Sequence, residues 1–171
     1  MKKRMETVCK MMAMSILLLC SFLASLDFKI PDIAKDSKPI YLIFGRVLKV
    51  KSGKKFVVIL ENKAQYDIVL YGIECPPIEK ACGALAKHEL ENFISGYKVF
   101  CYVLQYENDV YQAIVYRSYV NFSVNHYVVT RGYSWLSDEC GFQEYCDWWQ
   151  SSLLDAKVKG IGIWGDSVLK K

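Results

Sequence analysis

The spacing of apolar residues along the chain changes several times between a pattern typical of β-strands and one typical of helices. These changes divide the chain into predicted strands and helices. Three runs rich in β-branched and aromatic residues lie at 40–50, 56–60 and 66–70, a composition that favours β-strands. Between the first two runs, the polar stretch 51–55 contains a glycine and predicts a hairpin turn. We therefore expect three consecutive strands in this part of the chain.

After residue 77 the apolar residues are spaced as in an α-helix. Apolar residues recur three or four positions apart within 78–95, and Gly96 follows as a stop signal. Five strands with a helix between the third and fourth, and helices after the fifth, follow the order of an OB-fold barrel. We therefore expect an α+β fold, a five-stranded β-barrel with three helices. The later elements are expected as strands at 97–105 and 110–116 around a turn at 107–109, then helices at 122–131 and 142–159.

The N-terminus has the pattern of a targeting segment. Four basic residues, the last of them Lys10, lie before or next to an uncharged apolar run at 11–26, which is typical of an export signal. The run is shorter than the roughly 20 residues of a spanning helix, so residues 1–26 are interpreted as a signal peptide or an N-terminal membrane anchor. Residues 27–39 are polar, contain two prolines and are interpreted as a linker before a domain at 40–171. We expect an exported protein that is periplasmic, secreted, or associated with the membrane through residues 11–26.

This segment also carries most of the net charge. The chain has a formal net charge of +4, and residues 1–26 hold four basic residues against the single acidic Glu6. The remainder is therefore near neutral, and its charge gives no indication of a polyanionic partner.

Five cysteines follow the leader, which is many for a domain of this size. In an oxidising compartment, the local pairs to test first are Cys75 with Cys82 and Cys140 with Cys146, although buried reduced thiols fit the sequence equally well. With no Cys-x-x-Cys motif and two histidines, we expect no zinc or other metal site.

The stretch at 68–77, I-V-L-Y-G-I-E-C-P-P, resembles the turn after the third strand of staphylococcal-nuclease-like (thermonuclease) domains, which commonly reads i-R-L-x-G-I-D-A-P-E. The resemblance covers residues 45–166 and implies an SNase-like OB-fold barrel, in a degenerate member similar to short exported bacterial forms. Four later segments resemble the landmarks of this family in the same order: Cys82-Gly83 with Ala86 and Leu90, Gly96 to Cys101, Val120 to Trp135, and Gly162-Ile163-Trp164.

The resemblance breaks down at the catalytic positions. Active relatives hydrolyse phosphodiesters with bound calcium, carboxylate ligands, a glutamate that activates water, and two arginines that face the phosphate. Here Val69 and Val110 stand at the arginine positions, Pro77 at the glutamate and Lys54 at a calcium-binding aspartate, while Glu74 keeps a carboxylate at a ligand position. The resemblance therefore implies a nuclease fold that has lost its nuclease activity.

We expect no catalytic residue and no cofactor. Glu74, Glu79 and Asp109 remain weak catalytic candidates, and calcium would bind only if the chain were still active. That alternative function is a divergent metal-dependent phosphodiesterase of the thermonuclease family, acting on DNA or RNA.

The domain is expected to act as a binding or interaction module. Lys49, Lys51, Lys54 and Lys55 crowd the first hairpin, and Trp135 resembles the aromatic residue near the family's site. Basic groups beside an aromatic platform suit single-stranded nucleic acid, but the same lysines also fit a solvated turn, and the tryptophan fits a core position.

Tyrosines between residues 97 and 145, followed by Trp148 and Trp149, also suit a protein interface. They fit a core built from aromatic residues equally well. The partner therefore stays open between an unknown protein and single-stranded nucleic acid.

Overall fold

A computed structural model describes residues 40–138 and 140–165. The predicted leader at 1–26 and linker at 27–39 lie outside the described residues. The described part of the chain contains no helix that is long and apolar enough to cross a membrane.

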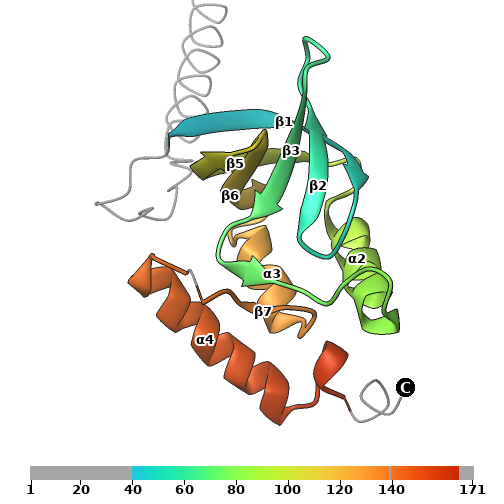
Figure 1. Ribbon diagram of the computed structural model, residues 1–171, viewed down its shortest axis with the longest axis vertical. Coiled ribbons are helices and arrows are strands. Elements are labelled where there is room, and N and C mark those ends of the chain that lie inside the picture. Colours follow the sequence, from blue (N-terminus) through green and yellow to red (C-terminus); the bar gives the residue numbers. More distant parts are fainter. Residues whose placement is uncertain (1–39, 139, 166–171) are drawn as a thin grey trace, which may run out of the picture. The chain divides into compact units, whose positions relative to one another are not determined.

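Five strands close into a mixed β-barrel (Figure 1). The order around the barrel is β1-β2-β3-β6-β5, with β5 returning to β1. All neighbouring pairs are antiparallel except β3 and β6, which run parallel. Together with the helices this is an α+β architecture that is consistent with an OB-like fold. The barrel strands are β1 (Tyr41–Val50), β2 (Lys55–Ile59), β3 (Gln65–Leu70), β5 (Lys98–Glu107) and β6 (Val110–Arg117).

The strand bounds agree with the sequence prediction to within two residues, because each run combines β-forming residues with flanking turn signals. The hairpin between β1 and β2 is closed by Ser52, whose Oγ accepts hydrogen bonds from the Lys54 and Lys55 amides at 3.4 and 3.1 Å. The buried apolar residues on the strands form the core: Ile43, Val47, Val50, Phe56, Val57, Val58, Ile68, Leu70, Val99, Cys101, Val103, Leu104, Ala113, Ile114, Val115 and Tyr116.

Helix α2 (Ala81–Ile94) lies between β3 and β5 in the sequence and packs against β1. Its first turn approaches the preceding loop so closely that a Cβ on Gly83 would lie 1.9 Å from the Pro77 carbonyl oxygen. Only glycine fits this contact without displacing the backbone. The Cys-Gly pair at the start of this helix therefore has a steric explanation.

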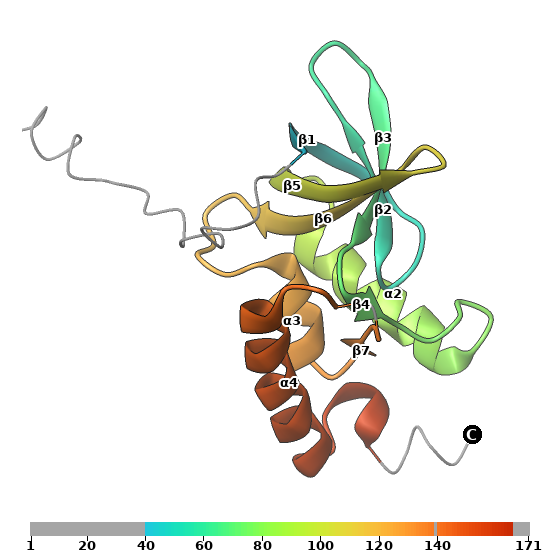
Figure 2. The same ribbon diagram turned by 60° about the vertical axis from the view of Figure 1, so that its left-hand side comes forward.

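Helices α3 (Val124–Thr130) and α4 (Gln143–Val158) lie side by side at one end of the barrel (Figures 1 and 2). The Ser123 hydroxyl caps α3 by accepting a hydrogen bond from the His126 amide at 3.1 Å. The sequence predicts a packing stripe of Trp148, Trp149, Leu153 and Ala156 on α4. Three of these residues are buried, but Trp148 is 49% exposed, so the prediction is wrong for this residue.

A second, two-stranded sheet was not predicted from the sequence. Strand β4 (Ile73–Glu74) pairs antiparallel with β7 (Trp135–Leu136), so that Glu74 lies opposite Trp135. The short 3₁₀ helix η1 (Gly162–Trp164) follows α4. This ladder and η1 place the C-terminal part of the chain beside the turn that leaves β3.

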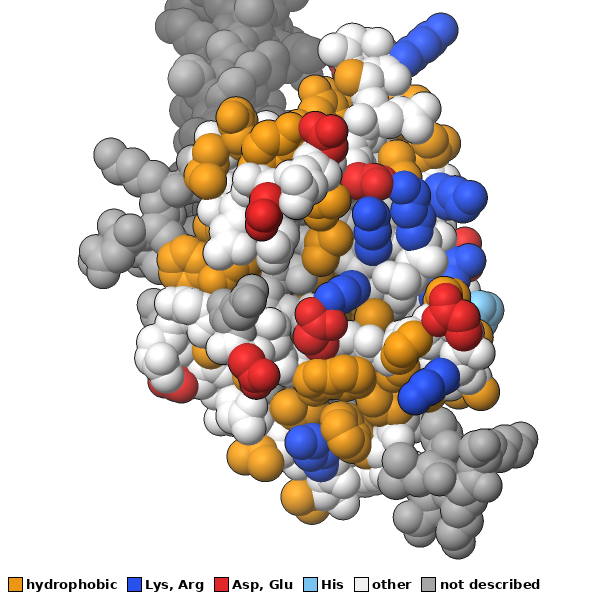
Figure 3. Space-filling model, viewed as in Figure 1, with side chains coloured by type: hydrophobic (Ala, Val, Ile, Leu, Met, Phe, Trp, Pro, Cys, Tyr) orange, Lys and Arg blue, Asp and Glu red, His pale blue; other side chains and the backbone are white. Residues whose placement is uncertain are grey.

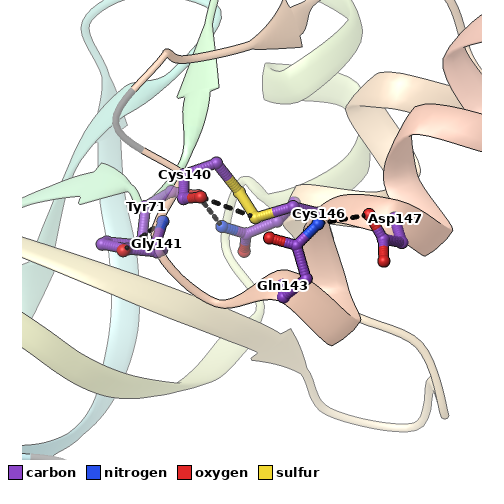
Figure 4. Close-up of a disulfide and its surroundings, with 7 residues drawn as sticks. Tyr71, Cys140, Gly141, Gln143, Cys146 and Asp147 are labelled. Atoms are coloured by element: carbon purple, nitrogen blue, oxygen red, sulfur yellow. Dashed lines mark hydrogen bonds between the residues drawn. A yellow bond between two sulfur atoms is a disulfide. The ribbon is translucent and has the colours of Figure 1, made fainter.

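One of the two predicted cysteine pairs is formed. Cys140 and Cys146 are joined by a disulfide at the start of α4, with an S–S distance of 2.00 Å (Figure 4). The other predicted pair is wrong, because Cys75 and Cys82 are both free thiols. The Cys75 thiol lies beside the first hairpin, where a Cβ on Gly53 would come within 3.1 Å of its sulfur.

Candidate functional site

A cavity of about 230 Å³ opens where the first hairpin meets the ends of β3 and β6. Val69 and Gln112 are register partners in the parallel β3–β6 pair, which brings the two strands' side chains to the same wall. The lining residues are Lys54, Val69, Leu70, Gly72, Ile73, Glu74, Val110, Gln112 and Ser137.

Lys54 and Glu74 form an ion pair in this cavity. The Lys54 Nζ lies 2.5 Å from Glu74 Oε1, and the two side chains are 28% and 41% exposed. The Lys54 backbone is fixed by its carbonyl, which accepts a hydrogen bond from the Leu70 amide at 2.9 Å. Glu74 is held in the short ladder opposite Trp135. Both charges are therefore positioned by backbone pairing.

A buried amide fixes the wall behind the cavity. Asn125 Nδ2 donates to the carbonyl oxygens of Tyr71 and Ala113 at 3.0 and 3.2 Å, and its Oδ1 accepts from the Val115 amide at 3.0 Å. These bonds join α3 to β6 and to the turn after β3. Sequence reasoning missed this residue, because a polar residue in a short helix carries no signal of burial.

Cys75 lies next to the ion pair and is held in the thiol form. Burial raises the pKa of Cys75 to about 11, with a smaller lowering by Lys54 and a further rise caused by Glu74. A neutral thiol is a poor nucleophile and a poor metal ligand at neutral pH. The geometry therefore gives this cysteine no evident chemical role.

Three of the four replaced catalytic positions come together in the cavity lining, namely Lys54, Val69 and Val110. The fourth, Pro77, is exposed on the loop before α2 and is not part of this lining. The positions that the resemblance assigns to calcium and phosphate thus share one cavity, but they carry two valines and a paired lysine.

The two remaining acidic candidates lie elsewhere. Glu79 is exposed on the loop before α2 and is not a lining residue of the cavity. Asp109 sits in the β5–β6 turn, where its Oδ1 accepts a hydrogen bond from the Tyr106 hydroxyl at 2.8 Å. Among the described residues, Glu74 is therefore the one carboxylate that lines the cavity.

This set of donors does not fit calcium. Calcium takes about six to eight oxygen ligands, whereas the cavity supplies one carboxylate that is already bound to an ammonium. Within residues 40–138 and 140–165, no three His, Cys, Asp or Glu side chains gather where they could hold a metal ion.

The hairpin lysines are largely engaged by acidic partners. Lys51 and Lys55 contact Asp67 of β3 at 2.6 and 3.2 Å. Burial of Asp67 acts to raise its pKa, but the hydrogen bonds and charges of the two lysines outweigh it and hold the pKa below its usual value. Lys49 is exposed on β1 and has no ion-pair partner among the described residues.

Trp135 is half-buried and lines two further hollows. One, of about 350 Å³, is bounded by Glu74, Trp135, Leu136, Ser137 and Asp138. The other, of about 500 Å³, lies between β7, α4 and η1 and is lined by Trp135, Leu136, Gln150, Leu153, Lys157 and Trp164. Each hollow shares lining residues with the next, so the three are neighbours, and we call the set the mouth groove.

The face shown in Figure 3 reflects this division of surface chemistry. Lysine and arginine side chains gather beside β2, and hydrophobic side chains gather lower down, over β7 and the end of α4. The apolar end of the mouth groove was not predicted from the sequence, although Trp164 belongs to the closing Gly-Ile-Trp motif. The position of Trp164 depends on the close approach of the Gly132 and Gly162 backbones. Beside this contact, the Ile163 amide donates a hydrogen bond to the Gly132 carbonyl at 2.9 Å.

No known family model matches the chain, and a search of curated proteins found no relative.

Proposed function

We propose that the chain is a non-catalytic SNase-like domain with an OB-fold barrel, whose mouth groove binds a segment of a partner protein. The cavity at the mouth of the barrel supports this proposal. It combines three of the four replaced positions that the family resemblance assigns to catalysis, and each of these replacements removes a group that phosphodiester hydrolysis requires.

The chemistry of the groove favours a protein segment over a phosphate backbone. Fixed, unpaired positive charge is what binds phosphates, but Lys54 is paired with Glu74, and Lys51 and Lys55 share Asp67. The groove instead offers valine side chains, a neutral amide at Gln112 and a half-buried tryptophan. Apolar walls with a few polar groups are typical of sites that hold peptide side chains.

The observation that carries the proposal is that neighbouring hollows of the mouth groove share lining residues. Glu74 and Ser137 line the first and second, while Trp135 and Leu136 line the second and third. An extended segment bound along this series would place one side chain against Val69 and Val110 and another against Trp135. Tyrosine, tryptophan and arginine contacts dominate the energy of many protein interfaces, so Trp135 is the expected anchor.

Export is part of the same proposal. Disulfides persist in oxidising compartments, and the Cys140–Cys146 bond is compatible with a periplasmic, secreted or membrane-anchored protein. A fusion of the N-terminal segment to a reporter that is active only outside the cytoplasm tests this step.

The binding role is tested with peptides selected from a random library on the full chain in detergent micelles. Affinities of the selected peptides are then measured for the wild type, for Trp135→Ala and for Leu154→Ala. Leu154 is exposed on α4 and lines none of the three hollows, which makes it the matched control. We expect Trp135→Ala to weaken binding at least about tenfold, or 1.4 kcal/mol, and Leu154→Ala to leave it unchanged.

A milder variant guards against misfolding, because Trp135 also pairs with β4. Glu74→Gln keeps the shape of the side chain and leaves Lys54 without its partner. Peptides that bind the groove should change affinity with this variant, while thermal unfolding stays close to the wild type. Selected peptides that bind all three variants and the wild type equally would contradict the proposal.

A further inference from the structure

The outer face of β1 exposes an unusual row of large apolar side chains. Ile40, Leu42, Phe44 and Leu48 are 56%, 61%, 42% and 52% exposed. Their neighbours Ile43 and Val47 point into the barrel and are buried, so the alternation of the strand places Leu42 and Phe44 on the outside. Leu48 is exposed at the register shift between Val47 and Lys49. Contiguous exposed apolar surface of this kind marks an interaction site in soluble domains.

Strand β5 extends this face on one side. Leu42 lies opposite Tyr102, and Phe44 lies opposite Phe100, with the two phenyl rings stacked at a centroid distance of 4.5 Å. The Lys98 ammonium lies 5.4 Å from the centre of the Phe44 ring. We call the set Ile40, Leu42, Phe44, Leu48, Phe100 and Tyr102 the β1–β5 face.

The charges near this face are basic. Arg46 lies opposite Lys98 across the two strands. The lysines of the following hairpin are paired with Asp67 and Glu74, so the positive charge of this face comes from Arg46 and Lys98. The face therefore combines exposed apolar side chains with positive charge and has no nearby carboxylate from its own strand.

A group of tyrosines lies at the start of β1. Tyr41 makes edge-on contacts with Tyr106 and Tyr111, both at 6.3 Å between ring centres, and Tyr66 contacts Tyr111 at 5.3 Å. Tyr41 and Tyr106 are exposed. Tyrosine is enriched where protein meets the boundary between lipid and water, because its ring is apolar and its hydroxyl is polar.

An apolar run and a short linker precede β1 in the sequence. The apolar run at 11–26 is separated from β1 by the segment 27–39. A linker of this length spans at most roughly 45 Å when fully extended. If the run is held in a bilayer, this linker keeps the start of β1 within about 45 Å of the lipid surface.

We propose that the β1–β5 face docks onto the lipid bilayer that holds residues 11–26. Leu42, Phe44 and Leu48 enter the boundary between headgroups and acyl chains, and Arg46 and Lys98 contact the anionic lipid phosphates. Burial of apolar area combined with attraction to anionic lipids is the general basis of such interfacial binding. This surface consists of residues other than those of the mouth groove, so it does not depend on the peptide-binding role.

The test uses a photoreactive side chain in the full chain, incorporated into vesicles of phosphatidylethanolamine and phosphatidylglycerol. p-Benzoylphenylalanine replaces Leu42 in one variant and Leu154 in the control, a leucine on α4 that is 53% exposed. The replacement is apolar and lies at an exposed position, so the fold should be retained, and thermal unfolding of both variants verifies this. After illumination, mass spectrometry identifies what each position has captured.

We expect Leu42→p-benzoylphenylalanine to form covalent lipid adducts at least fivefold more often than Leu154→p-benzoylphenylalanine. The proposal also predicts that replacing phosphatidylglycerol by a neutral lipid lowers the adduct yield at position 42. Four outcomes would overturn it: a dimer of the chain crosslinked at position 42, a crosslink from position 42 to residues 27–39, no lipid adduct, or equal lipid adducts at both positions.

Discussion

Lys54 and Glu74 face each other across the mouth of the barrel, with the ammonium nitrogen 2.5 Å from a carboxylate oxygen. The pair neutralises the one carboxylate that residues 40–138 and 140–165 contribute to the cavity lining. A cation that entered would have to displace the lysine and would meet its positive charge nearby, at a cost of several kcal/mol at partly exposed positions. This relationship is the structural basis for our proposal that the mouth of the barrel binds a partner and does not carry out metal-assisted hydrolysis.

The first prediction reverses this charge. Lys54→Asp removes the ammonium and places a second carboxylate near Glu74, so that the cavity gains an affinity for calcium. At a calcium concentration about tenfold above the dissociation constant, binding stabilises the fold by about 1.4 kcal/mol. The unfolding midpoint of the variant should then rise by about 4 °C, as measured by thermal unfolding in calcium and in chelator.

The matched control for this experiment is Lys49→Asp, which changes the same charge on the exposed part of β1 outside the cavity. Neither this variant nor the wild type should respond to calcium. A calcium-dependent rise in the midpoint of the wild type would show that the ion pair does not block the site.

The second prediction concerns the contact between α2 and the loop before it. A methyl group at position 83 would lie 1.9 Å from the Pro77 carbonyl oxygen, so Gly83→Ala should lower the free energy of unfolding by about 3 kcal/mol. Gly96→Ala is the comparison, because Gly96 has a φ of +74° and nothing within 4 Å of an added methyl group. Its cost should be about 1 kcal/mol, from backbone conformation alone. Equal costs in denaturant unfolding would show that the Gly83 contact is not tight.

The third prediction concerns the disulfide. Cys140 and Cys146 are six positions apart, and closing a loop of this length stabilises a fold by about 2 kcal/mol in the chain-entropy account. Replacing both cysteines with serine should cost that amount, and a reducing agent should have the same effect on the wild type. Cys82→Ser is the control, because Cys82 is a free thiol. If reduction left the wild-type midpoint unchanged, this bond would not contribute to stability.

The fourth prediction concerns stability in acid. Lys51 and Lys55 hold the pKa of Asp67 below its usual value, against the opposing effect of burial. A carboxyl group whose pKa is lower in the folded state stabilises the fold above its unfolded pKa of about 4, and this contribution is lost as the pH falls through the folded value. Asp67→Asn should therefore flatten the loss of stability below about pH 4. The effect should stay under about 1 kcal/mol, because the side chains are partly exposed.

Asp155→Asn is the control for this measurement, because Asp155 pairs with Lys159 at a position where both side chains are 59% exposed. Denaturant titrations between neutral and acidic pH compare the three proteins. Parallel pH profiles for the wild type and Asp67→Asn would exclude the proposed contribution.

The strands of the barrel were predictable because local signals agree with the global fold. In β1 and β2, runs of β-forming residues end at the polar turn around Gly53. In contrast, the β4–β7 ladder pairs two residues with two others about 60 positions away, and such short segments have no period to detect. The placement of Trp135 beside Glu74 therefore required the tertiary structure.

The site was predictable only in part, for a similar reason. The resemblance to a nuclease motif singled out Lys54, Val69 and Val110, and the parallel pairing of β3 with β6 brings them to one cavity. The sequence could not show that Lys54 pairs with Glu74, because an ion pair between a hairpin turn and a distant short strand depends on where each backbone lies. The choice between cysteine partners likewise depends on thiol orientation, and Cys75 faces the hairpin instead of Cys82.

A nuclease assay tests most directly whether the mouth of the barrel has lost phosphodiesterase activity. The full chain in detergent micelles is incubated with single-stranded DNA and with RNA, in calcium and in chelator, beside a Glu74→Gln variant. We expect no cleavage products from DNA or RNA under any of these conditions. Cleavage that requires calcium, stops with chelator and disappears in Glu74→Gln would contradict it, because the mouth of the barrel would then be an active phosphodiesterase site.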